Sequence, residues 1–250
     1  MSLMKTKIFL SVAVMAVITG CAPKPTKSSD TITDNFSYNM AGQGQTLQIS
    51  FTKGVTHNHP CMAFWVEDEN GNYIQTLFVN KSVGKGIFEH GSTATGKWEP
   101  DVRRNPALLP RWSHKRGVLA EDSLYIPSPA RPVPDAYTGP TPLHHFVLIS
   151  KLDKPMQGKI CVFMEINQTW DWNEYWTNNK YPDDKNYKTS CQPALVYKAV
   201  IDLSQPSAQA ELLPIGHSHY SGSDGNIDAD LSTITTALKI AEKVTVQVVP

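Results

Sequence analysis

Short apolar runs with a strand period recur along the chain and are separated by turn residues. Within Gln45–Thr52, Leu47, Ile49 and Phe51 alternate with polar residues, a pattern typical of a half-buried strand. The dipeptide Asn70-Gly71 separates two further runs and is a strong signal for a β-hairpin. The other predicted strands are Met62–Glu67, Tyr73–Val79, Leu143–Ser150, Lys159–Ile166, Ala194–Asp202 and Val244–Val249.

Helical patterns are fewer than strand patterns. Ala107–Lys115 predicts one or two helical turns within a Pro-, Gly- and Arg-rich insertion between Gly84 and Pro142, and Asp230–Ile240 predicts a helix. Because the strands follow one another without helices between them, we expect a mainly β fold with little helix. The expected architecture is an antiparallel β-sandwich, immunoglobulin- or fibronectin-like, formed by residues 36–250 with the insertion as a long loop.

The amino terminus has the features of an export signal. Lys5 and Lys7 precede an apolar run of eleven residues, Ile8–Ile18, which is too short to span a bilayer. Ile18-Thr19-Gly20-Cys21 follows and resembles the lipobox of bacterial lipoproteins, in which the cysteine is acylated. We therefore predict a lipoprotein signal peptide over residues 1–20 and stable membrane anchoring through lipid on Cys21.

The segment after the cysteine indicates where the protein is anchored, and the overall charge limits the class of partner. Residues 21–35 are rich in Pro, Ser, Thr and Lys and predict a flexible linker. By resemblance to lipoprotein sorting in Gram-negative bacteria, Ala22 favours the outer membrane, on its periplasmic or surface face. Basic and acidic residues balance at 23 each, which argues against nucleic acid as a partner, because that requires a basic surface.

Three cysteines remain beside Cys21. Cys61 and Cys161 lie in strand-like apolar runs, where cysteine most often packs as a small hydrophobic residue. A Cys61–Cys161 disulfide is the alternative, since an exported protein permits one. The sequence does not assign Cys191, which precedes Gln192-Pro193.

Two histidine pairs are candidate metal ligands. His57 and His59 are two residues apart, as are His217 and His219, and side chains two apart in an extended segment point to the same side. Imidazole suits zinc or copper, so the two pairs together predict a four-histidine metal site. The alternative is that these are loop histidines that bind backbone groups.

A short motif before the strand at Leu143 is a candidate flavin-attachment site. Asp135, Thr138, Gly139 and Thr141 match the pattern Asp-x-x-Ser/Thr-Gly-Ala-Thr, which it resembles and in which a transferase links FMN to the final hydroxyl. Pro140 replaces the usual Ala and removes a backbone N–H. A Gly-Pro turn leading into the strand is the alternative, and we prefer it.

Three tryptophans lie close together in the segment Trp170–Trp176. Trp170, Trp172 and Trp176 stand among Asn and Asp residues, and many sugar sites combine flat rings with polar side chains in this way. The alternative is that the rings close the open end of the sandwich, with their N–H groups satisfied locally. We prefer this second interpretation.

Several segments together resemble a bacterial periplasmic family, domain of unknown function 2271. The resemblance begins with Phe64–Leu77, which is similar to the first hairpin of that family, and it extends over roughly Gln45 to Asp202. It continues through Leu109–Trp112, Asp135–Thr141, Cys161–Asn167 and Gln192–Tyr197. The resemblance implies a secreted sandwich domain whose genes lie near flavin transferases and membrane redox proteins.

These patterns leave four functional hypotheses. Hydrolase, metalloprotease, phosphate-loop and dinucleotide motifs are absent from the sequence, so we expect a non-enzymatic accessory or binding component. We expect it to be lipid-anchored in the cell envelope and to serve an extracytoplasmic flavin or metal redox system. The alternatives are a copper or zinc protein, a covalent FMN carrier at Thr141, and a glycan-binding lipoprotein.

Overall fold

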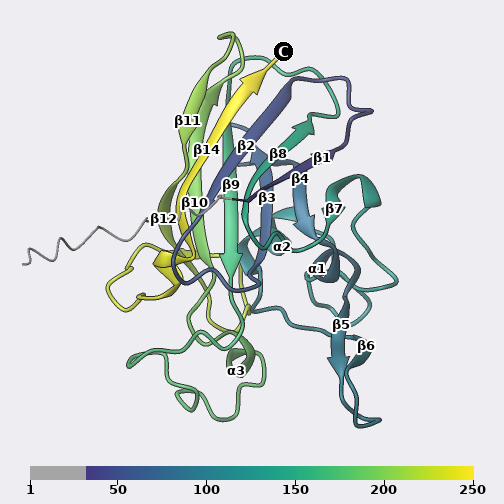
Figure 1. The fold of residues 1–250 in the computed structure, drawn as a ribbon, viewed down its shortest axis with the longest axis vertical. Coiled ribbons are helices and arrows are strands. Elements are labelled where there is room, and N and C mark those ends of the chain that lie inside the picture. The colour runs from purple at the N-terminus through teal and green to yellow at the C-terminus, as the bar shows by residue number, and fades with distance from the viewer. Residues whose placement is uncertain (1–31) are drawn as a thin grey trace, which may run out of the picture. The chain divides into compact units, whose positions relative to one another are not determined.

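Two large β-sheets dominate the structure, a computed structural model that describes residues 32–250 (Figure 1). The five-stranded sheet has the order β1 (Thr33–Tyr38), β8 (His145–Lys151), β2 (Thr46–Lys53), β14 (Ala241–Val249) and β11 (Gln209–Glu211). The seven-stranded sheet has the order β13 (Ile227–Asp228), β12 (Leu213–Ser218), β10 (Leu195–Asp202), β9 (Lys159–Asn167), β3 (Cys61–Glu67), β4 (Tyr73–Asn80) and β7 (Thr138–Gly139). The described residues are therefore mainly β, as the sequence predicts.

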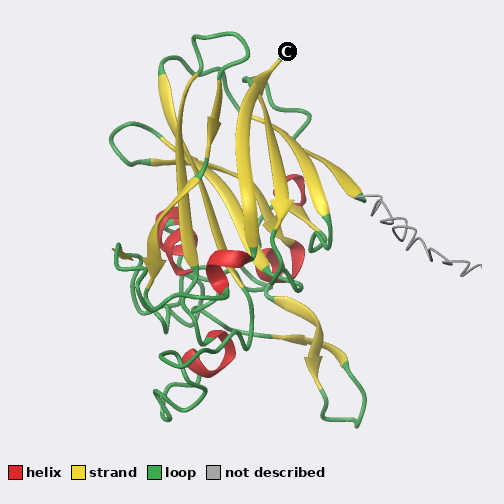
Figure 2. Ribbon diagram, turned by 60° about the vertical axis from the view of Figure 1, so that its left-hand side comes forward, coloured by secondary structure: helices red, strands yellow, loops and turns green. Residues whose placement is uncertain are grey.

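Short elements complete the described fold. A separate hairpin consists of β5 (Ile87–Ser92) and β6 (Glu99–Val102). The helices are α1 (Lys81–Lys85), α2 (Pro110–Arg116) and α3 (Tyr187–Ser190), with 3₁₀ turns at Asp135–Tyr137 and Ala237–Lys239. Figure 2 shows that the helices and most loops lie toward one end of the strands.

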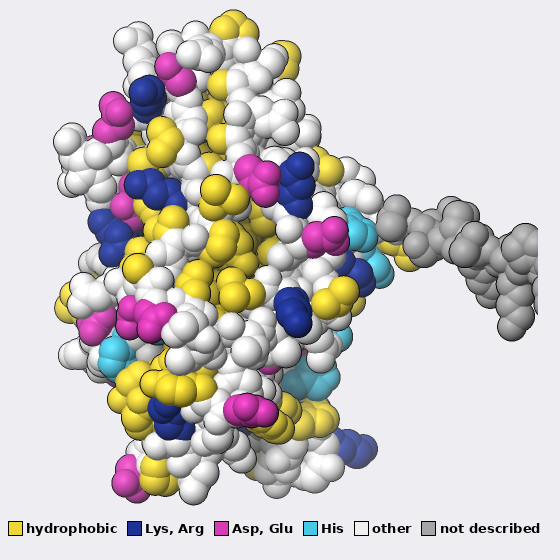
Figure 3. Space-filling model, turned by 90° about the vertical axis from the view of Figure 1, so that its left-hand side faces the viewer, with side chains coloured by type: hydrophobic (Ala, Val, Ile, Leu, Met, Phe, Trp, Pro, Cys, Tyr) yellow, Lys and Arg dark blue, Asp and Glu magenta, His cyan; other side chains and the backbone are white. Residues whose placement is uncertain are grey.

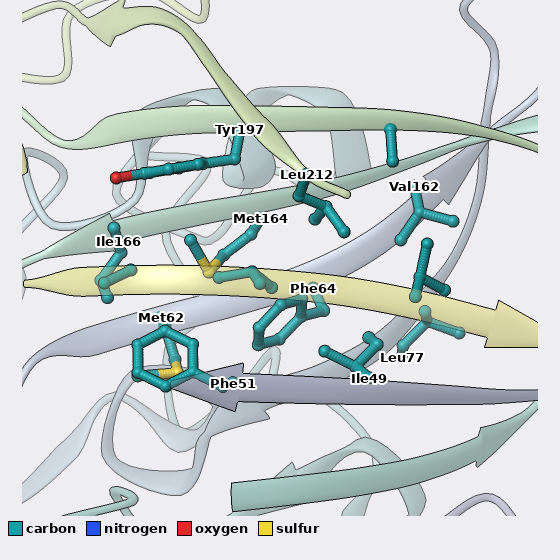
Figure 4. Close-up of a cluster of buried hydrophobic side chains, with 14 of the residues drawn as sticks. Ile49, Phe51, Met62, Phe64, Leu77, Val162, Met164, Ile166, Tyr197 and Leu212 are labelled. Carbon is teal, nitrogen blue, oxygen red and sulfur yellow. The ribbon is translucent and has the colours of Figure 1, made fainter. Parts of the chain in front are cut away.

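The main hydrophobic core takes side chains from both large sheets. Leu47, Ile49 and Phe51 of β2 are buried, which confirms the alternation read from the sequence, and they pack in one cluster with Phe64 of β3 and Met164 of β9. Figure 4 shows the side chains of Ile49, Phe51, Phe64 and Met164 between the strands. Burial of this apolar surface is the main force that holds the fold together.

The insertion after Gly84 covers the other face of the seven-stranded sheet. Trp112 of α2 is fully buried and packs in a second cluster with Trp65 of β3 and Phe163 of β9. The buried Glu165 carboxylate of β9 accepts hydrogen bonds from the backbone N–H groups of Arg111 at 3.1 Å and Trp112 at 2.8 Å. This carboxylate holds the start of α2 on the sheet, because these N–H groups have no partner within the helix.

Three predictions of local structure need correction. Asp230–Ile240 forms turns with a single 3₁₀ turn at its end, because the carboxylate of Asp230 caps the N–H of Ser232 instead of leading into a helix. The expected linker ends earlier than residue 35, since β1 begins at Thr33 and pairs with β8. The ladders are also not all antiparallel: β1 with β8 and β4 with β7 are parallel, and long connections rather than hairpins join them.

The alternative disulfide is wrong. In the pairing of β3 with β9, Cys61 lies opposite Asn167 and Cys161 lies opposite Glu67, so the two cysteines are at opposite ends of the ladder. Six residues of strand separate them by about 20 Å, whereas a disulfide needs Cα atoms within about 7 Å. Cys61, Cys161 and Cys191 are all free thiols.

The predicted signal peptide and the lipidation site lie outside the described residues. Residues 1–20, Cys21 and most of the linker belong to this part of the chain. Within residues 32–250, every helix is too short or too polar to cross a membrane.

Candidate functional site

Residues 168–192, within the connection between β9 and β10, form a loop that carries the tryptophans, and we call it the tryptophan loop. Figure 1 places it with α3 at the lower end of the view, below the strands. The side chains of Trp170 and Trp172 are 63% and 53% exposed, and that of Tyr175 is 52% exposed. Trp176 is only 6% exposed. The loop therefore uses one tryptophan as a plug and presents the other two to solvent.

A buried amide fixes the tryptophan loop against a neighbouring loop. Gln192 is 1% exposed, and its Nε2 donates to the backbone oxygen of Asp171 at 3.2 Å and to the hydroxyl of Thr236. Its Oε1 accepts from Asn173 Nδ2 at 3.2 Å and from the N–H of Thr235 at 2.8 Å. Satisfied polar networks of this kind make a loop rigid, so the backbone that carries the exposed rings is held in place.

Backbone strain occurs at the first exposed tryptophan. Trp170 has a φ of 60°, in the left-handed region that bulky residues rarely adopt. Its N–H donates to the backbone oxygen of Thr189 at 3.0 Å, and the N–H of Trp172 donates to the oxygen of Trp170 at 3.1 Å. Strain of this kind is concentrated at functional sites.

An open hollow of about 670 Å³ is lined by residues 180–186 of the same loop and by Tyr220, and we call it the aromatic hollow. Tyr181 and Tyr220 are stacked with centroids 4.0 Å apart, and the ring of Tyr187 meets Tyr181 edge-on at 4.9 Å. Figure 3 shows hydrophobic side chains, a class that there includes Tyr and Trp, among Lys, Asp and Glu at the lower end of this face.

Lys180, which lines the aromatic hollow, also contacts aromatic rings of the tryptophan loop. The Lys180 ammonium lies 3.0 Å from the ring centroid of Tyr175 and 4.8 Å from that of Trp176, and it donates to the backbone oxygen of Tyr175 at 3.2 Å. A cation over aromatic rings is attracted by their negative faces. The site therefore offers flat rings, the cations of Lys180 and Lys185, and the side chains of Asp183 and Asn186 to a ligand.

The two histidine pairs do not meet. Met62, Ile166, Leu195 and His217 are neighbours on β3, β9, β10 and β12, so three strand spacings of about 4.8 Å separate the first from the last. His57 and His59 precede β3, and no group of three or more His, Cys, Asp or Glu within residues 32–250 is arranged to hold a metal ion. The predicted four-histidine site is not assembled in the described structure.

Each histidine has a local environment instead. His217 donates from Nδ1 to the backbone oxygen of Ser218 at 2.9 Å, and the N–H of Ser221 donates to Nδ1 of His219 at 3.2 Å. His57 packs edge-on against Phe51, and burial lowers the pKa of His57 to about 4. His217 and His219 therefore contact backbone groups, as the alternative expects, but His217 lies in β12 and not in a loop, and the buried His57 Nε2 has no hydrogen-bond partner.

The flavin motif occupies a packed corner of the seven-stranded sheet. Thr141 is half-buried, and its hydroxyl accepts a hydrogen bond from Asn80 Nδ2 at 2.8 Å. Thr138 and Gly139 are buried, and a Cβ at Gly139 would lie 1.6 Å from the Tyr38 hydroxyl oxygen. The remaining motif residue, Asp135, is exposed and pairs with Lys85 at 2.7 Å. A transferase would have to displace the Asn80 contact, so the geometry gives flavin attachment no support.

Sequence reasoning missed two residues of the site. Gln192 was assigned no role beyond the family resemblance, and Tyr220 belongs to the loop after β12, 39 positions after Tyr181. The pairing of β10 with β12 brings these loops together.

No protein-family model matches the chain, and neither does any curated protein or solved structure. The resemblance to the domain of unknown function 2271 family therefore stays a prediction.

Proposed function

We propose that the chain is a lipid-anchored protein of the cell envelope that binds glycans at the tryptophan loop and the aromatic hollow, without catalysing a reaction. The observation that carries this proposal is the exposure of Trp170, Trp172 and Tyr175 on a loop fixed by the buried Gln192 amide. Large rings held in solvent lose favourable burial, and such exposure is typical of a binding surface.

The chemistry of the site suits a pyranose. The apolar face of a sugar ring stacks on an indole or phenol, and its hydroxyls bind amides, carboxylates and ammonium groups. The aromatic hollow has these polar groups around the stacked pair Tyr181 and Tyr220. An open hollow of about 670 Å³ has room for more than one sugar unit.

The proposal also includes the location of the protein at the outer membrane and the type of its β fold. Lipid on Cys21, after removal of residues 1–20, would hold the protein at the outer membrane, where glycans are abundant. We assign the two large sheets to a β-sandwich of immunoglobulin or fibronectin type, because one hydrophobic cluster contains side chains from both.

A fluorescence titration tests the proposal. The full chain in detergent is titrated with hexaoses of β-linked glucose and of N-acetylglucosamine, and intrinsic tryptophan emission is followed. Removing one stacking ring by Trp170→Ala or Trp172→Ala should weaken binding about tenfold, since a buried aromatic contact contributes about 1–2 kcal/mol. Trp98→Ala is the matched control, because Trp98 is 57% exposed between β5 and β6, outside the tryptophan loop.

The titration of the three variants distinguishes glycan binding at the tryptophan loop from its absence. Saturable binding that is weakened about tenfold in both loop variants and unchanged in Trp98→Ala supports the proposal. Equal affinity of all three variants, or no saturation with either sugar, contradicts it.

A further inference from the structure

A second and smaller cavity, of about 150 Å³, lies at the end of α2, apart from the aromatic hollow. Its walls come from β4, the end of α2, the segment before β7 and the turn after β8. The polar side chains that line it include Tyr73, Thr76, Arg116, Tyr137 and Asp153.

One nitrogen of the half-buried Arg116 guanidinium lacks a hydrogen-bond partner. Its Nη1 is buried and has no hydrogen-bond partner, and within residues 32–250 the side chain forms no ion pair. The guanidinium carbon lies 5.8 Å from the ring centroid of the fully buried Trp112, which fixes its position on one side. Partial burial lowers the pKa of Arg116, and taking a cation out of water is unfavourable unless an anion or hydrogen-bond acceptors meet it.

A relay of hydrogen bonds gives the same cavity a second donor. Trp112 Nε1 donates to the Thr76 hydroxyl at 2.9 Å, and that hydroxyl lies 2.7 Å from the Tyr73 hydroxyl. Thr76 can donate its own proton to Tyr73 while it accepts from Trp112. The O–H of Tyr73 then remains available to donate to a ligand.

We infer that this cavity binds a small carboxylate, which the Arg116 guanidinium pairs with and the Tyr73 hydroxyl donates to. Planar carboxylates match the fork of an arginine, and a volume of about 150 Å³ admits a small organic acid. This site is independent of the proposed glycan site, because the two share no lining residue.

One carboxylate also lines the cavity. Asp153 Oδ1 accepts hydrogen bonds from Tyr137 at 2.7 Å and from Asn39 Nδ2 at 2.8 Å. Its negative charge favours a ligand that carries an ammonium group beside its carboxylate. The test therefore compares acetate, a carboxylate alone, with glycine, which has both charges.

The experiment is a titration of the full chain in detergent with sodium acetate or glycine. Ring signals of isotope-labelled tyrosines are followed by NMR, and sodium chloride at equal ionic strength is the reference. We expect a saturable shift of the Tyr73 signal with an apparent dissociation constant in the millimolar range, of the order of 1 mM. Tyr125 does not line the cavity and should stay unchanged.

Variants assign the effect to the guanidinium. Arg116→Gln should weaken binding at least about tenfold, and Arg116→Lys several-fold because the fork is lost. Arg103→Gln removes an exposed arginine outside the cavity and should leave binding unchanged. If Arg116→Gln fails to fold, the wild-type comparison of Tyr73 with Tyr125 still decides.

Every result counts for or against the site. Saturable acetate binding supports it, and tighter binding of glycine that Asp153→Asn abolishes identifies an amino acid as the ligand. The inference is overturned if neither probe saturates, if chloride shifts Tyr73 equally, or if Arg116→Gln binds as the wild type does.

Discussion

Replacing Glu165 by Gln is expected to destabilise the protein more at pH 5 than at pH 8. The Glu165 carboxylate is fully buried and accepts from the N–H groups of Arg111 and Trp112 and from the hydroxyl of Ser218. An amide has only one oxygen, so its NH₂ group faces at least one of these donors. One unsatisfied buried donor costs about 1–3 kcal/mol, and this part of the loss is present at pH 8.

The pH dependence follows from the raised pKa. Burial raises the pKa of Glu165 from 4.5 to about 7, against the opposing effect of its three donors. The folded protein therefore holds this proton more tightly than the unfolded chain does. The resulting stabilisation is fully present below pH 4.5 and is lost as the pH rises through 7. Between pH 5 and pH 8 the wild type should lose roughly 2–3 kcal/mol through this residue, and Glu165→Gln should not.

The assay is urea unfolding followed by tryptophan fluorescence at pH 5 and pH 8. The difference in the free energy of unfolding between wild type and Glu165→Gln should be roughly 2–3 kcal/mol larger at pH 5 than at pH 8. Ser218→Ala is the matched variant: it removes one donor to the carboxylate, raises the pKa further and steepens the pH dependence. A difference that is the same at both pH values, or larger at pH 8, refutes the reasoning.

Two further predictions test the packing and the histidine environment. Gly139→Ala should destabilise the fold by about 1–3 kcal/mol or more in urea unfolding, because its Cβ would overlap the Tyr38 hydroxyl; unchanged stability contradicts this. The His57 ring should stay neutral at pH 5 in an NMR titration, since burial and Lys53 lower its pKa to about 4. Its contribution to stability should therefore fall as the pH drops from 6.5 toward 4, and a His57 pKa near 6.5 would disprove the burial argument.

Core strands were predictable because burial on one face produces alternation. Leu47, Ile49 and Phe51 show this pattern and are buried, and Asn70-Gly71 marks the hairpin between β3 and β4. The strands β11, β12 and β13 were not predicted, because these short strands at or next to a sheet edge are held by backbone pairing and carry little alternation. The Asp230–Ile240 helix failed because Asp, Ser and Thr side chains bind nearby backbone groups.

The site was predictable only in part. The segment Trp170–Trp176 was a candidate, but spacing alone does not show that Trp176 is buried while Trp170 and Trp172 are exposed. Tyr220 and Arg116 come to their cavities through tertiary contacts between distant segments. The four-histidine hypothesis failed for the same reason, since residue spacing carries no information on how strands are ordered in a sheet.

The most direct test of glycan binding is an NMR titration of the six indole N–H signals of the full chain with the preferred hexaose. We expect saturable shifts of the Trp170 and Trp172 indole signals, while the signals of Trp65, Trp98 and Trp112 stay unchanged. Shifts confined to Trp98, or no saturable shift at Trp170 and Trp172, would contradict it.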